Sequence, residues 1–515
     1  MTTDDLRLRR PSAALCGILA LLAALAAGHL VASFIAVDAS PYLAVGSSAI
    51  DLTPTWLKDF AVRTFGTHDK EVLLGGMAVV MLVVAAVAGL ISVRRVWPGA
   101  ALVTVFGLVG VVAVLTRPSL TPVAVLAPLA SVLVGVGAFL LLHRISSRIG
   151  ARDEDGRRSG TPRRAFLIGG AGVVVGSGVA AGAGQLIGST RDAASSRAAI
   201  GRLAPARRAP AIPADADFEK LGTPSFLTPN ARFYRVDTAL SVPQLRAEDW
   251  SLRIHGMVDQ ERTYRYSDIR GRALVERTIT MTCVSNEVGG DYVSTSNFIG
   301  IDVADLLEEC GVQRGAQQLF ATSVDGWTSG TPVEAMLDRG RGAMLAIGMN
   351  GEPLPLEHGF PARLVTPGLY GYVSATKWVI DLEVTTWAAR QAYWLRRGWG
   401  QEAPIKTESR IDQPKGFATV PAGAVRLSGI AWAQHKGIER VEISVDNGPW
   451  TPTTLSTEVN EDTWRMWWAQ LSVKPGTHQV FCRATDKTGY TQTSDRAGTV
   501  PDGATGWHST TFIAS

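Results

Sequence analysis

Hydrophobic positions divide the chain into a very apolar first third and a more polar remainder with short alternating patterns. Long apolar runs without an interior charge occupy residues 13–36, 72–93, 100–115 and 123–142. Each is close to the roughly 20 residues that an α-helix needs to cross the hydrocarbon core of a membrane. Because four buried soluble helices in succession are a rarer explanation, we predict a four-helix membrane region over residues 1–145.

Arginines lie at alternate ends of these runs. They precede the first run, separate the second from the third and follow the fourth, as Arg10, Arg94, Arg95 and Arg144 illustrate. Cytoplasmic loops of membrane proteins carry the excess of Lys and Arg. These segments are therefore expected to be cytoplasmic, with the loop over residues 38–71 facing outward.

A basic cytoplasmic loop and a fifth apolar span are predicted for residues 146–188. Arg163 and Arg164, followed by Phe and Leu, stand just before a glycine-rich apolar run. This order resembles a twin-arginine export signal, a route that carries folded proteins. Positive-inside arginines ahead of an ordinary span are a compatible interpretation. The glycines of the run also predict a face for close helix packing.

Beyond the apolar segments the pattern predicts three further parts. Residues 189–223 are rich in Ala, Arg and Pro and are interpreted as an exposed linker. Short β-prone runs with a few helices then predict an α+β domain over residues 224–407. From residue 408 to 515, period-two strands separated by turn signals predict an all-β, immunoglobulin-like sandwich.

Composition excludes several classes of protein. Fifty Lys and Arg against 46 Asp and Glu give a net charge of +4, too balanced for a nucleic-acid surface. The four cysteines are scattered, which predicts neither a disulfide framework nor a zinc site. No haem attachment motif is present, and the membrane-region histidines, His29 and His143, are expected at opposite membrane faces. We therefore expect no haem.

Cys283 follows a β-prone run and opens a polar turn that closes on two glycines. Such a strand end presents a thiolate, a soft metal ligand, while glycines allow backbone to approach a bulky group. A buried structural cysteine at a strand end is the alternative. The motifs on both sides of Cys283 favour its assignment as a metal ligand.

These motifs resemble the sulfite oxidase family of molybdopterin enzymes over residues 224–515. The run TCVSNEVGGD at residues 282–291 is similar to the family's molybdenum-ligand segment, and the other matching motifs follow in the family's order. They are TPN with FYR at residues 228–235, NGEPLP at 350–355, HGFPAR at 358–363, VTPG and YG at 365–371, KW at 377–378 and ESRID at 408–412. The membrane region lies outside the resemblance.

The resemblance implies a molybdenum held by one pterin dithiolene and the Cys283 thiolate, performing two-electron oxygen-atom transfer. It implies that Arg235, Arg363 and Lys377 bind the anionic cofactor, and that Asp325 and His358 hydrogen-bond the pterin. The cofactor-binding set is completed by Asn230, Phe233 and Tyr234, and Tyr370 is the second catalytic candidate.

Each of these residues has an ordinary alternative. Asp325 is also typical of a turn, and His358 is also typical of a solvated loop. Arg363 and Lys377 are also typical of a charged surface. Cys482 is expected to pack on a strand. Tyr372, Arg396 and Arg397 are further candidates for a substrate mouth, although both arginines are also typical of an exposed surface.

Glu287 departs from the family's pattern, because sulfite-oxidising members carry an arginine-bearing segment after the ligand cysteine. A carboxylate there repels an anionic substrate unless it points away or is paired. The expected substrate is therefore a sulfoxide or a sulfite-like compound that accepts or donates oxygen, and electrons pass to or from an external partner. Membrane lipid and a homodimer through the C-terminal domain are the other expected partners, and nucleic acid is not.

Two other functions compete with the enzyme. One is a non-catalytic extracytoplasmic binding or scaffold module on a membrane anchor. The other is a multispan redox or transport unit, which the lack of internal charges and paired histidines argues against.

Overall fold

The structure is a computed structural model that describes residues 8, 10–54, 57, 60–61, 64–65, 69–117, 120–150, 161–190 and 193–515. The chain forms two compact units. Unit 1 comprises Met1–Asp192 and Thr238–Val242, and unit 2 comprises Ala193–Asp237 and Pro243–Ser515. The cytoplasmic arginine candidates Arg7, Arg9, Arg152, Arg157 and Arg158 lie outside the described residues, as do the side chains of Arg148, Arg163 and Arg164.

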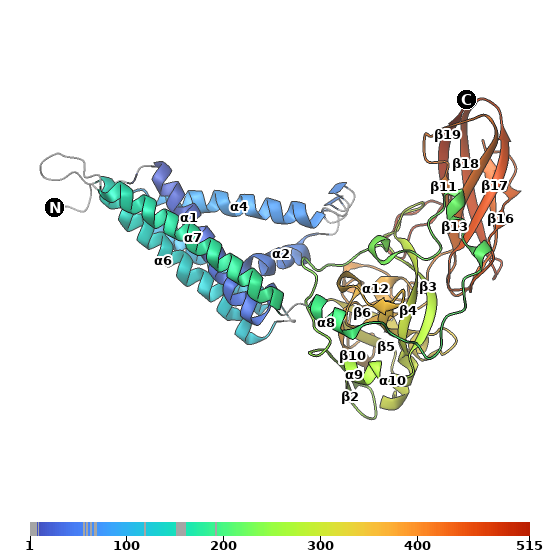
Figure 1. Cartoon of the computed structure of the whole chain (residues 1–515), viewed down its shortest axis with the longest axis horizontal. Coiled ribbons are helices and arrows are strands. Elements are labelled where there is room, and N and C mark those ends of the chain that lie inside the picture. Colours follow the sequence, from blue (N-terminus) through green and yellow to red (C-terminus); the bar gives the residue numbers. More distant parts are fainter. Residues whose placement is uncertain are drawn as a thin grey trace, which may run out of the picture. The chain divides into compact units, whose positions relative to one another are not determined.

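Unit 1 is built from helices. They are α1 (Arg10–Ile35), α2 (Pro41–Leu52), α4 (Asp69–Ile91), α5 (Trp97–Leu115), α6 (Leu126–Gly150) and α7 (Thr161–Thr190), with short 3-10 turns η1 (Val37–Ala39) and η3 (Pro122–Val125). Helices α1, α6 and α7 run side by side (Figure 1). Leu19, Phe139 and Leu142 lie in the buried cluster between helices.

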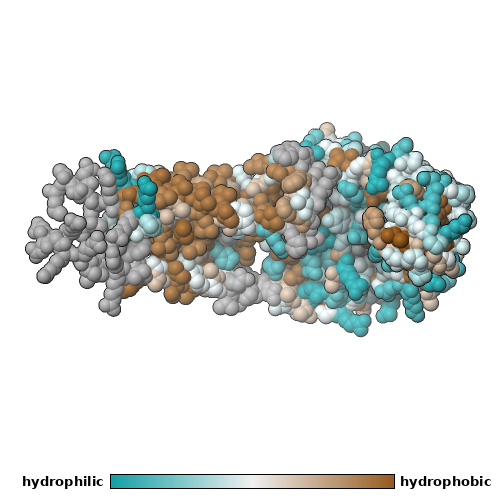
Figure 2. Space-filling model, turned by 90° about the horizontal axis from the view of Figure 1, so that it is seen from above, coloured by the Kyte–Doolittle hydropathy of each residue, from teal (hydrophilic) through white to brown (hydrophobic). Residues whose placement is uncertain are grey.

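Four of these helices are long and apolar enough to cross a membrane: Arg10–Ile35, Lys70–Ile91, Trp97–Leu115 and Pro122–Ser147. They confirm the four predicted apolar helices. Many of their large apolar side chains face outward, including Val79, Val112 and Leu133 (Figure 2). Water disfavours an apolar surface of this extent, whereas lipid accommodates it. The apolar part of α7, Ile168–Gly184, is shorter.

Close helix packing in unit 1 occurs at glycines other than the predicted ones. A Cβ at Gly17 of α1 would lie 1.8 Å from the carbonyl oxygen of Ala85, and a Cβ at Gly89 of α4 would lie 1.9 Å from that of Ala13. Only glycine allows these backbones to approach so closely. Around the glycines of α7 at 172, 176, 178 and 182, no described atom lies within 4 Å of an added Cβ. The predicted packing face on α7 is therefore wrong in the described structure.

The five residues Thr238–Val242 belong to unit 1 although they come from the middle of the chain. The Ser241 hydroxyl donates a hydrogen bond to Asp38 Oδ1 at 2.6 Å. The Lys70 ammonium donates to the carbonyl oxygen of Ala239 at 2.6 Å. Asp38 and Lys70 stand near the two ends of the loop that was predicted to face outward, so this segment is held on one side of the helices.

Unit 2 begins with α8 (Ala193–Ile200), within the segment that was expected to be an exposed linker. The Arg197 guanidinium donates to the carbonyl oxygens of Pro353 and Leu354, and Ile200 and Leu203 enter the apolar core. Ala216 is also fully buried. This segment therefore differs from an exposed tether, because its few apolar side chains find partners that are distant in sequence.

The α+β part of unit 2 contains two five-stranded sheets. The first has the order β2-β1-β10-β5-β6, and the second has the order β3-β4-β7-β8 with β9 also paired to β7. The strands are β1 (Ser251–Gly256), β2 (Arg262–Arg265), β3 (Val275–Thr282), β4 (Val293–Asp302), β5 (Gln318–Ser323), β6 (Thr328–Pro332), β7 (Met344–Met349), β8 (Glu352–Pro353), β9 (Arg363–Val365) and β10 (Val379–Thr385).

Short helices connect these strands. They are η4 (Ala214–Ala216), η5 (Glu219–Leu221), η6 (Asn230–Arg232), α9 (Tyr266–Arg270), α10 (Val303–Cys310), α11 (Val333–Leu337), η7 (Leu356–His358), α12 (Gly371–Ser374) and η8 (Leu395–Arg397). Residues of both sheets, such as Leu382 and Leu345, and of α10, such as Leu306, share one buried core. The predicted α+β class is confirmed.

The C-terminal part of unit 2 is an all-β sandwich, as predicted (Figure 1). One sheet has the order β11-β13-β17-β16 and the other β12-β19-β18-β14-β15. The strands are β11 (Glu408–Gln413), β12 (Thr419–Val420), β13 (Gly423–Trp432), β14 (Ile438–Val445), β15 (Thr451–Pro452), β16 (Thr454–Leu455), β17 (Arg465–Val473), β18 (Gly476–Asp486) and β19 (His508–Ala514). Cys482 lies in the core between the sheets.

Within unit 2 the sandwich is joined to the strand that leads to Cys283. The Gln434 side-chain amide donates to Thr282 Oγ1 at 2.8 Å and to the carbonyl oxygen of Thr280 at 3.2 Å. The Trp464 backbone N–H donates to Thr280 Oγ1 at 2.7 Å. The sandwich therefore pairs with the C-terminal end of the edge strand β3, where Thr280 N also donates to the carbonyl oxygen of Asp462 at 2.9 Å.

Candidate active site

Cys283 lies directly after β3, where its β-branched and apolar residues end. Its backbone N–H donates to the carbonyl oxygen of Tyr292 at 3.0 Å, and its carbonyl oxygen accepts from Asn286 N at 3.0 Å. Asn286 Oδ1 accepts from Tyr292 N at 2.8 Å and closes the loop from inside. The thiol therefore stands on a turn whose backbone polar groups are paired, which holds its direction.

The loop after Cys283 turns back at two glycines. Gly290 N donates to the carbonyl oxygen of Glu287 at 2.8 Å. Gly289 has φ +82°, and a Cβ there would lie 2.1 Å from Cδ2 of His508 on β19. The His508 ring is itself fixed, because its Nδ1 accepts a hydrogen bond from Ile411 N at 3.0 Å.

Gly289→Ala is expected to lower the thermal unfolding midpoint and to reduce cofactor retention. A non-glycine residue at positive φ costs about 1–3 kcal/mol. An added Cβ would also push against the His508 ring, which its hydrogen bond from Ile411 N holds in place. Thermal unfolding and metal content of the purified variant measure both effects. Gly416→Ala is the matched control, because an added Cβ there meets nothing within 4 Å. An unchanged midpoint for Gly289→Ala would contradict the steric argument.

Tyr234 connects the Cys283 thiol with a buried guanidinium. Burial raises the pKa of the Tyr234 hydroxyl, nearby Cys283 raises this pKa further, and Arg363 lowers it. The Cys283 thiol is itself half-buried, and burial raises its pKa. Hydrogen bonds from the backbone and side chain of Ser285 lower this pKa, but by less. Tyr234, Cys283 and Arg363 thus share one electrostatic environment.

Arg363 is the least compensated charge of this environment. Its side chain is buried, and it donates to the carbonyl oxygens of Leu364, His358 and Ala375 at 3.4, 3.2 and 3.5 Å. Among the described residues no carboxylate lies within ion-pair distance of it, and burial lowers its pKa to about 10. A buried cation without a counter-ion is costly, so this position is suited to an anionic ligand.

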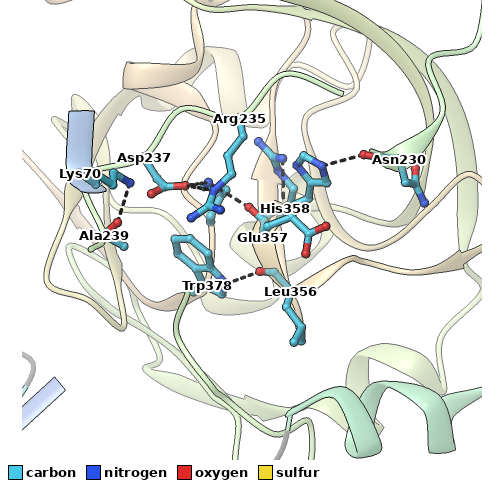
Figure 3. A network of polar contacts seen from close by, with 11 residues as sticks. Lys70, Asn230, Arg235, Asp237, Ala239, Leu356, Glu357, His358 and Trp378 are labelled. Carbon is cyan, nitrogen blue, oxygen red and sulfur yellow. Dashed lines mark hydrogen bonds and ion pairs between the residues drawn. The ribbon is translucent and has the colours of Figure 1, made fainter. Parts of the chain in front are cut away.

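A second cation, Lys377, lies in the same region and contacts Asp237 and Glu357, which Figure 3 shows together with Arg235 and His358. Lys377 Nζ donates to Asp237 Oδ2 at 2.7 Å and to the carbonyl oxygen of Glu357 at 3.1 Å, and burial lowers its pKa to about 8. Arg235 Nε bonds the same Asp237 oxygen at 2.9 Å. Two cations share one carboxylate here, which leaves net positive charge.

His358 and Asn230 form the adjoining wall. His358 Nε2 donates to the carbonyl oxygen of Asn230 at 3.0 Å, and the His358 ring packs edge-on against Phe233 at a centroid distance of 5.4 Å. The Asn230 side chain bonds Glu352 and Asn350. Burial lowers the pKa of His358 to about 4, and the positive charge of Arg363 is the next largest cause. The imidazole is therefore neutral near pH 7.

The neutral state of His358 predicts acid-sensitive folding. Its folded pKa, about 4, lies below its value of about 6.5 in the unfolded chain, so its stabilising contribution is complete above pH 6.5 and is lost as the pH falls toward 4. The full loss is roughly 3 kcal/mol. His358→Gln is expected to flatten this part of the curve of unfolding midpoint against pH, measured on cofactor-free protein.

His478→Gln is the control for this titration. The Lys474 carbonyl oxygen and the Asp446 carboxylate raise the pKa of His478. Protonation of His478 therefore stabilises the folded protein as the pH falls, which is the opposite of the effect of His358. The His478→Gln variant should keep the decline of the unfolding midpoint below pH 6.5. An unaltered decline in His358→Gln would contradict the assignment.

Asp325 forms no ion pair with any residue that the structure describes. Its Oδ1 accepts from Trp327 N at 3.1 Å, which is the turn contact that the sequence also allowed. Burial raises the Asp325 pKa, and Asp237 and Lys377 are close enough to affect it. The structure thus brings Asp325 close to Lys377 and Asp237.

Tyr370 lies on another side of the Cys283 loop. Its ring is buried in one apolar cluster with Val284 and Trp432, and its hydroxyl accepts from Lys406 N at 3.4 Å. Burial raises the Tyr370 pKa, and Glu408 and then Cys283 are among the charges that act on it. Tyr370 is therefore near the loop but within a packed core.

The other residues that were predicted to line the entrance for the substrate make different contacts. The Tyr372 hydroxyl donates to the carbonyl oxygen of Gly400 at 2.6 Å. The Arg397 guanidinium covers the Tyr393 ring at 3.6 Å, and Arg396 is exposed. Glu287 is also exposed, so its carboxylate reaches solvent.

Taken together, the donors fit a molybdenum-pterin cofactor. A thiol stands at one end of the region, and Arg363, Lys377 and Arg235 provide cations for a phosphate. The carboxyl of Asp325 provides an acceptor for pterin N–H groups. Asn286 Nδ2 is buried beside the thiol without a hydrogen-bond partner in the described structure, so one donor is left for a ligand or water.

Sequence reasoning missed several residues that hold this region. Asp237 lies two residues after the FYR motif and pairs with both Arg235 and Lys377. Arg410 donates to the carbonyl oxygen of Gly290 at 2.7 Å from the recognised ESRID motif. Gln434 and His508 reach the site only through tertiary contacts, and no local signal marks them.

Comparisons with known proteins point to one family. The family model described as the oxidoreductase molybdopterin binding domain matches residues 239–394. Mitochondrial sulfite oxidase from Macaca fascicularis is 28% identical over 317 residues, which cover 52% of this chain and 57% of that protein. The uncharacterized oxidoreductase YuiH of Bacillus subtilis (strain 168) is 31% identical over 150 residues, covering 29% of this chain and 72% of that protein.

A solved structure with a similar fold is the sulfane dehydrogenase SoxCD from Paracoccus pantotrophus. It has a TM-score of 0.47 and 24% sequence identity, with 52% of this chain and 75% of that chain covered. This chain spans little more than half the length of the mitochondrial sulfite oxidases that it matches.

Proposed function

Because the chain belongs to the sulfite oxidase-like family of molybdopterin-binding oxidoreductases, we propose that it is a membrane-anchored enzyme that performs two-electron oxygen-atom transfer. Cys283 is the proposed molybdenum ligand. The observation that carries the proposal is Arg363, a buried guanidinium without a carboxylate partner that shares the surroundings of Tyr234 with Cys283. An anionic cofactor supplies the missing charge.

The chain's own residues have separate tasks in this proposal. When bound, the molybdenum-pterin group supplies the two-electron chemistry. Arg363, Lys377 and Arg235 hold its anionic end, while Asp325, His358 and Asn230 orient the pterin. Phe233 and Tyr234 exclude water from that side, since both rings stack against each other at 5.3 Å. Tyr370 is proposed to line the substrate side of the Cys283 loop.

The proposed substrate is a sulfoxide or a sulfite-like oxygen donor or acceptor. Glu287 is exposed four residues after Cys283, in the segment where the sulfite-oxidising pattern carries an arginine instead. A doubly charged anion would be repelled more strongly than a neutral oxide. Electrons are exchanged with an external partner. Dimerisation through residues 408–515 stays a prediction.

We place the catalytic domain on the extracytoplasmic face of a multi-pass anchor. The arginine distribution supports this orientation, and so do the bonds from Asp38 and Lys70 to Ser241 and Ala239, since all four would lie on the outward side. Arg163 and Arg164 would direct export of the folded domain. If Arg163→Lys with Arg164→Lys left export of cofactor-loaded protein unchanged, the twin-arginine signal would be rejected.

Metal and pterin analysis of the purified protein tests the cofactor directly. We expect one molybdenum and one pterin per chain. A screen with a dye acceptor and a dye donor, covering sulfite and several sulfoxides, then tests the reaction and its direction. Absence of stoichiometric molybdenum and pterin would reject the enzyme and leave a binding module on a membrane anchor.

A further inference from the structure

Thr238–Val242, which we call the strap, belong to unit 1 although the residues on both sides of them belong to unit 2. Lys70 Nζ on α4 donates to the carbonyl oxygen of Ala239 at 2.6 Å, and Ser241 Oγ donates to Asp38 Oδ1 on η1 at 2.6 Å. Both hydrogen bonds involve a charged group, and such bonds are stronger than those between neutral groups. Two side chains of unit 1 therefore hold the strap.

Packing against α2 adds to these bonds. A Cβ at Gly46 of α2 would lie 2.8 Å from Cδ1 of Leu240, so the glycine leaves the space that this side chain fills. Sδ of Met77 on α4 lies 3.4 Å from the same position. The strap forms no helix or strand of its own. Its conformation is therefore set by these contacts and not by backbone pairing.

The strap begins directly after Asp237. The side chain of Asp237 is 4% exposed, and its Oδ2 accepts from Lys377 Nζ at 2.7 Å and from Arg235 Nε at 2.9 Å. Ala239 follows two residues later, so the two Cα atoms are at most about 7 Å apart (Figure 3). Fixing Ala239 restricts the backbone of Asp237, and a restricted carboxylate loses less conformational entropy when it pairs with the two cations.

Asp237 also affects the charge of Lys377. Burial lowers the pKa of Lys377 to about 8, and the Asp237 carboxylate raises this pKa against the effect of burial. The charged and titratable residues around the Lys377 ammonium are Asp237, Arg235, Arg363, Asp325, His358 and Glu357. If Asp237 moved away, the pKa of Lys377 would fall further, and less of the cation would be present at neutral pH.

We propose that Lys70 and Asp38 are positioning residues for the cofactor: through the strap they keep Asp237 on the two cations that bind the anionic end of the cofactor. These cations are Lys377 and Arg235, so the inference rests on the roles proposed for them under the proposed function. Neither positioning residue touches the cofactor. The helices of unit 1 thus do more than anchor the enzyme, because retention of its cofactor depends on them.

Acylation of lysines in the cofactor-free, full-length protein in detergent tests this coupling, with each lysine followed by mass spectrometry. An amine reacts only when it is deprotonated and within reach of the reagent, and release of Asp237 favours both conditions for Lys377. Lys70→Met and Ser241→Ala each remove a hydrogen bond that holds the strap. Each should therefore raise the acylation rate of Lys377 about fivefold or more.

Two further variants separate the strap from general effects of substitution. Ser48→Ala is the matched control for Ser241→Ala, because Ser48 Oγ on α2 donates to the carbonyl oxygen of Ala44 in the same helix. This control should leave the acylation rate of Lys377 unchanged. Lys70→Arg keeps a cationic donor and should restore the slow rate that Lys70→Met loses.

Lys406, which pairs with Asp502, is the internal reference in every sample and should react at an unchanged rate. A rise at Lys406 equal to that at Lys377 would indicate general loosening of unit 2 and would overturn the proposal. An unchanged rate at Lys377 in both Lys70→Met and Ser241→Ala would overturn it as well.

Retention of pterin by the cofactor-loaded protein gives a second readout. Because the anionic end of the cofactor needs a charged Lys377, retained pterin should decline at high pH, and Lys70→Met should lose pterin at a lower pH than the unchanged protein. Pterin fluorescence after dialysis at a series of pH values measures both profiles. Coincident profiles would overturn the link to the cofactor. Absence of pterin from the unchanged protein would instead reject the proposed function, while the acylation rates would still report on the strap.

Discussion

Cys283→Ser is expected to lower turnover by more than about 100-fold and to remove molybdenum from the purified protein. Residues that only support a metal ligand cost about 10–100-fold when replaced, so the ligand itself should cost more. A serine hydroxyl is a harder donor and ionises far less readily than a thiol, so it replaces the thiolate poorly. Metal analysis, pterin fluorescence and dye-coupled turnover of the same preparation measure the loss.

Cys310→Ser is the matched control for this substitution. Cys310 is buried in the core of unit 2 at the end of α10, where the Tyr264 hydroxyl is its polar neighbour, so serine there buries a hydroxyl in place of a thiol. That change should lower stability by about 1–3 kcal/mol and leave the molybdenum content per folded chain unchanged. Full retention of cofactor in Cys283→Ser would reject Cys283 as the ligand.

Arg363→Met is expected to stabilise the cofactor-free protein and to abolish cofactor retention. Without the cofactor the Arg363 guanidinium is buried among carbonyl oxygens and has no carboxylate partner in the described structure. Replacing a buried charge with a hydrophobic side chain of similar volume is neutral or stabilising by about 1–4 kcal/mol. With the cofactor, the same change removes a cation for its anionic group. Arg363→Met should therefore raise the unfolding midpoint of the cofactor-free protein and lower the metal content of the purified protein.

Arg277→Met separates this effect from the general loss of an arginine. Arg277 Nη1 pairs with Asp302 Oδ1 at 2.6 Å, and both side chains are about four-fifths buried. Removing Arg277 leaves Asp302 without its partner, so this variant should be less stable and should keep its cofactor. If Arg363→Met also proved less stable and kept its cofactor, Arg363 would be a structural residue.

Local sequence patterns were sufficient for the four long apolar helices of unit 1 and for the α+β and all-β classes within unit 2. An apolar run of about 20 residues has few alternatives to a membrane helix, and period-two alternation has few alternatives to a strand. The ordered motifs around Cys283 indicated the family in the same way. Linear order is enough for such conclusions, because these signals lie within one element or one motif.

The tertiary structure decided which charges are compensated. Lys377 and Arg363 are both single cations in the sequence. Lys377 pairs with Asp237, 140 residues earlier, whereas Arg363 donates to carbonyl oxygens and has no carboxylate partner among the described residues. The same holds for the predicted linker and for the glycines of α7, whose neighbours are set by distant segments. His508 reaches Gly289 across more than 200 residues of chain.

The sequence by itself therefore determined the long apolar helices, the class of each part of unit 2, the family and the candidate metal ligand. Only the tertiary structure decided burial, hydrogen-bond partners and net local charge. The physical reason is that desolvation and pairing depend on atoms that are close in space, and in this chain those atoms come from motifs, loops and a sandwich that are far apart in sequence.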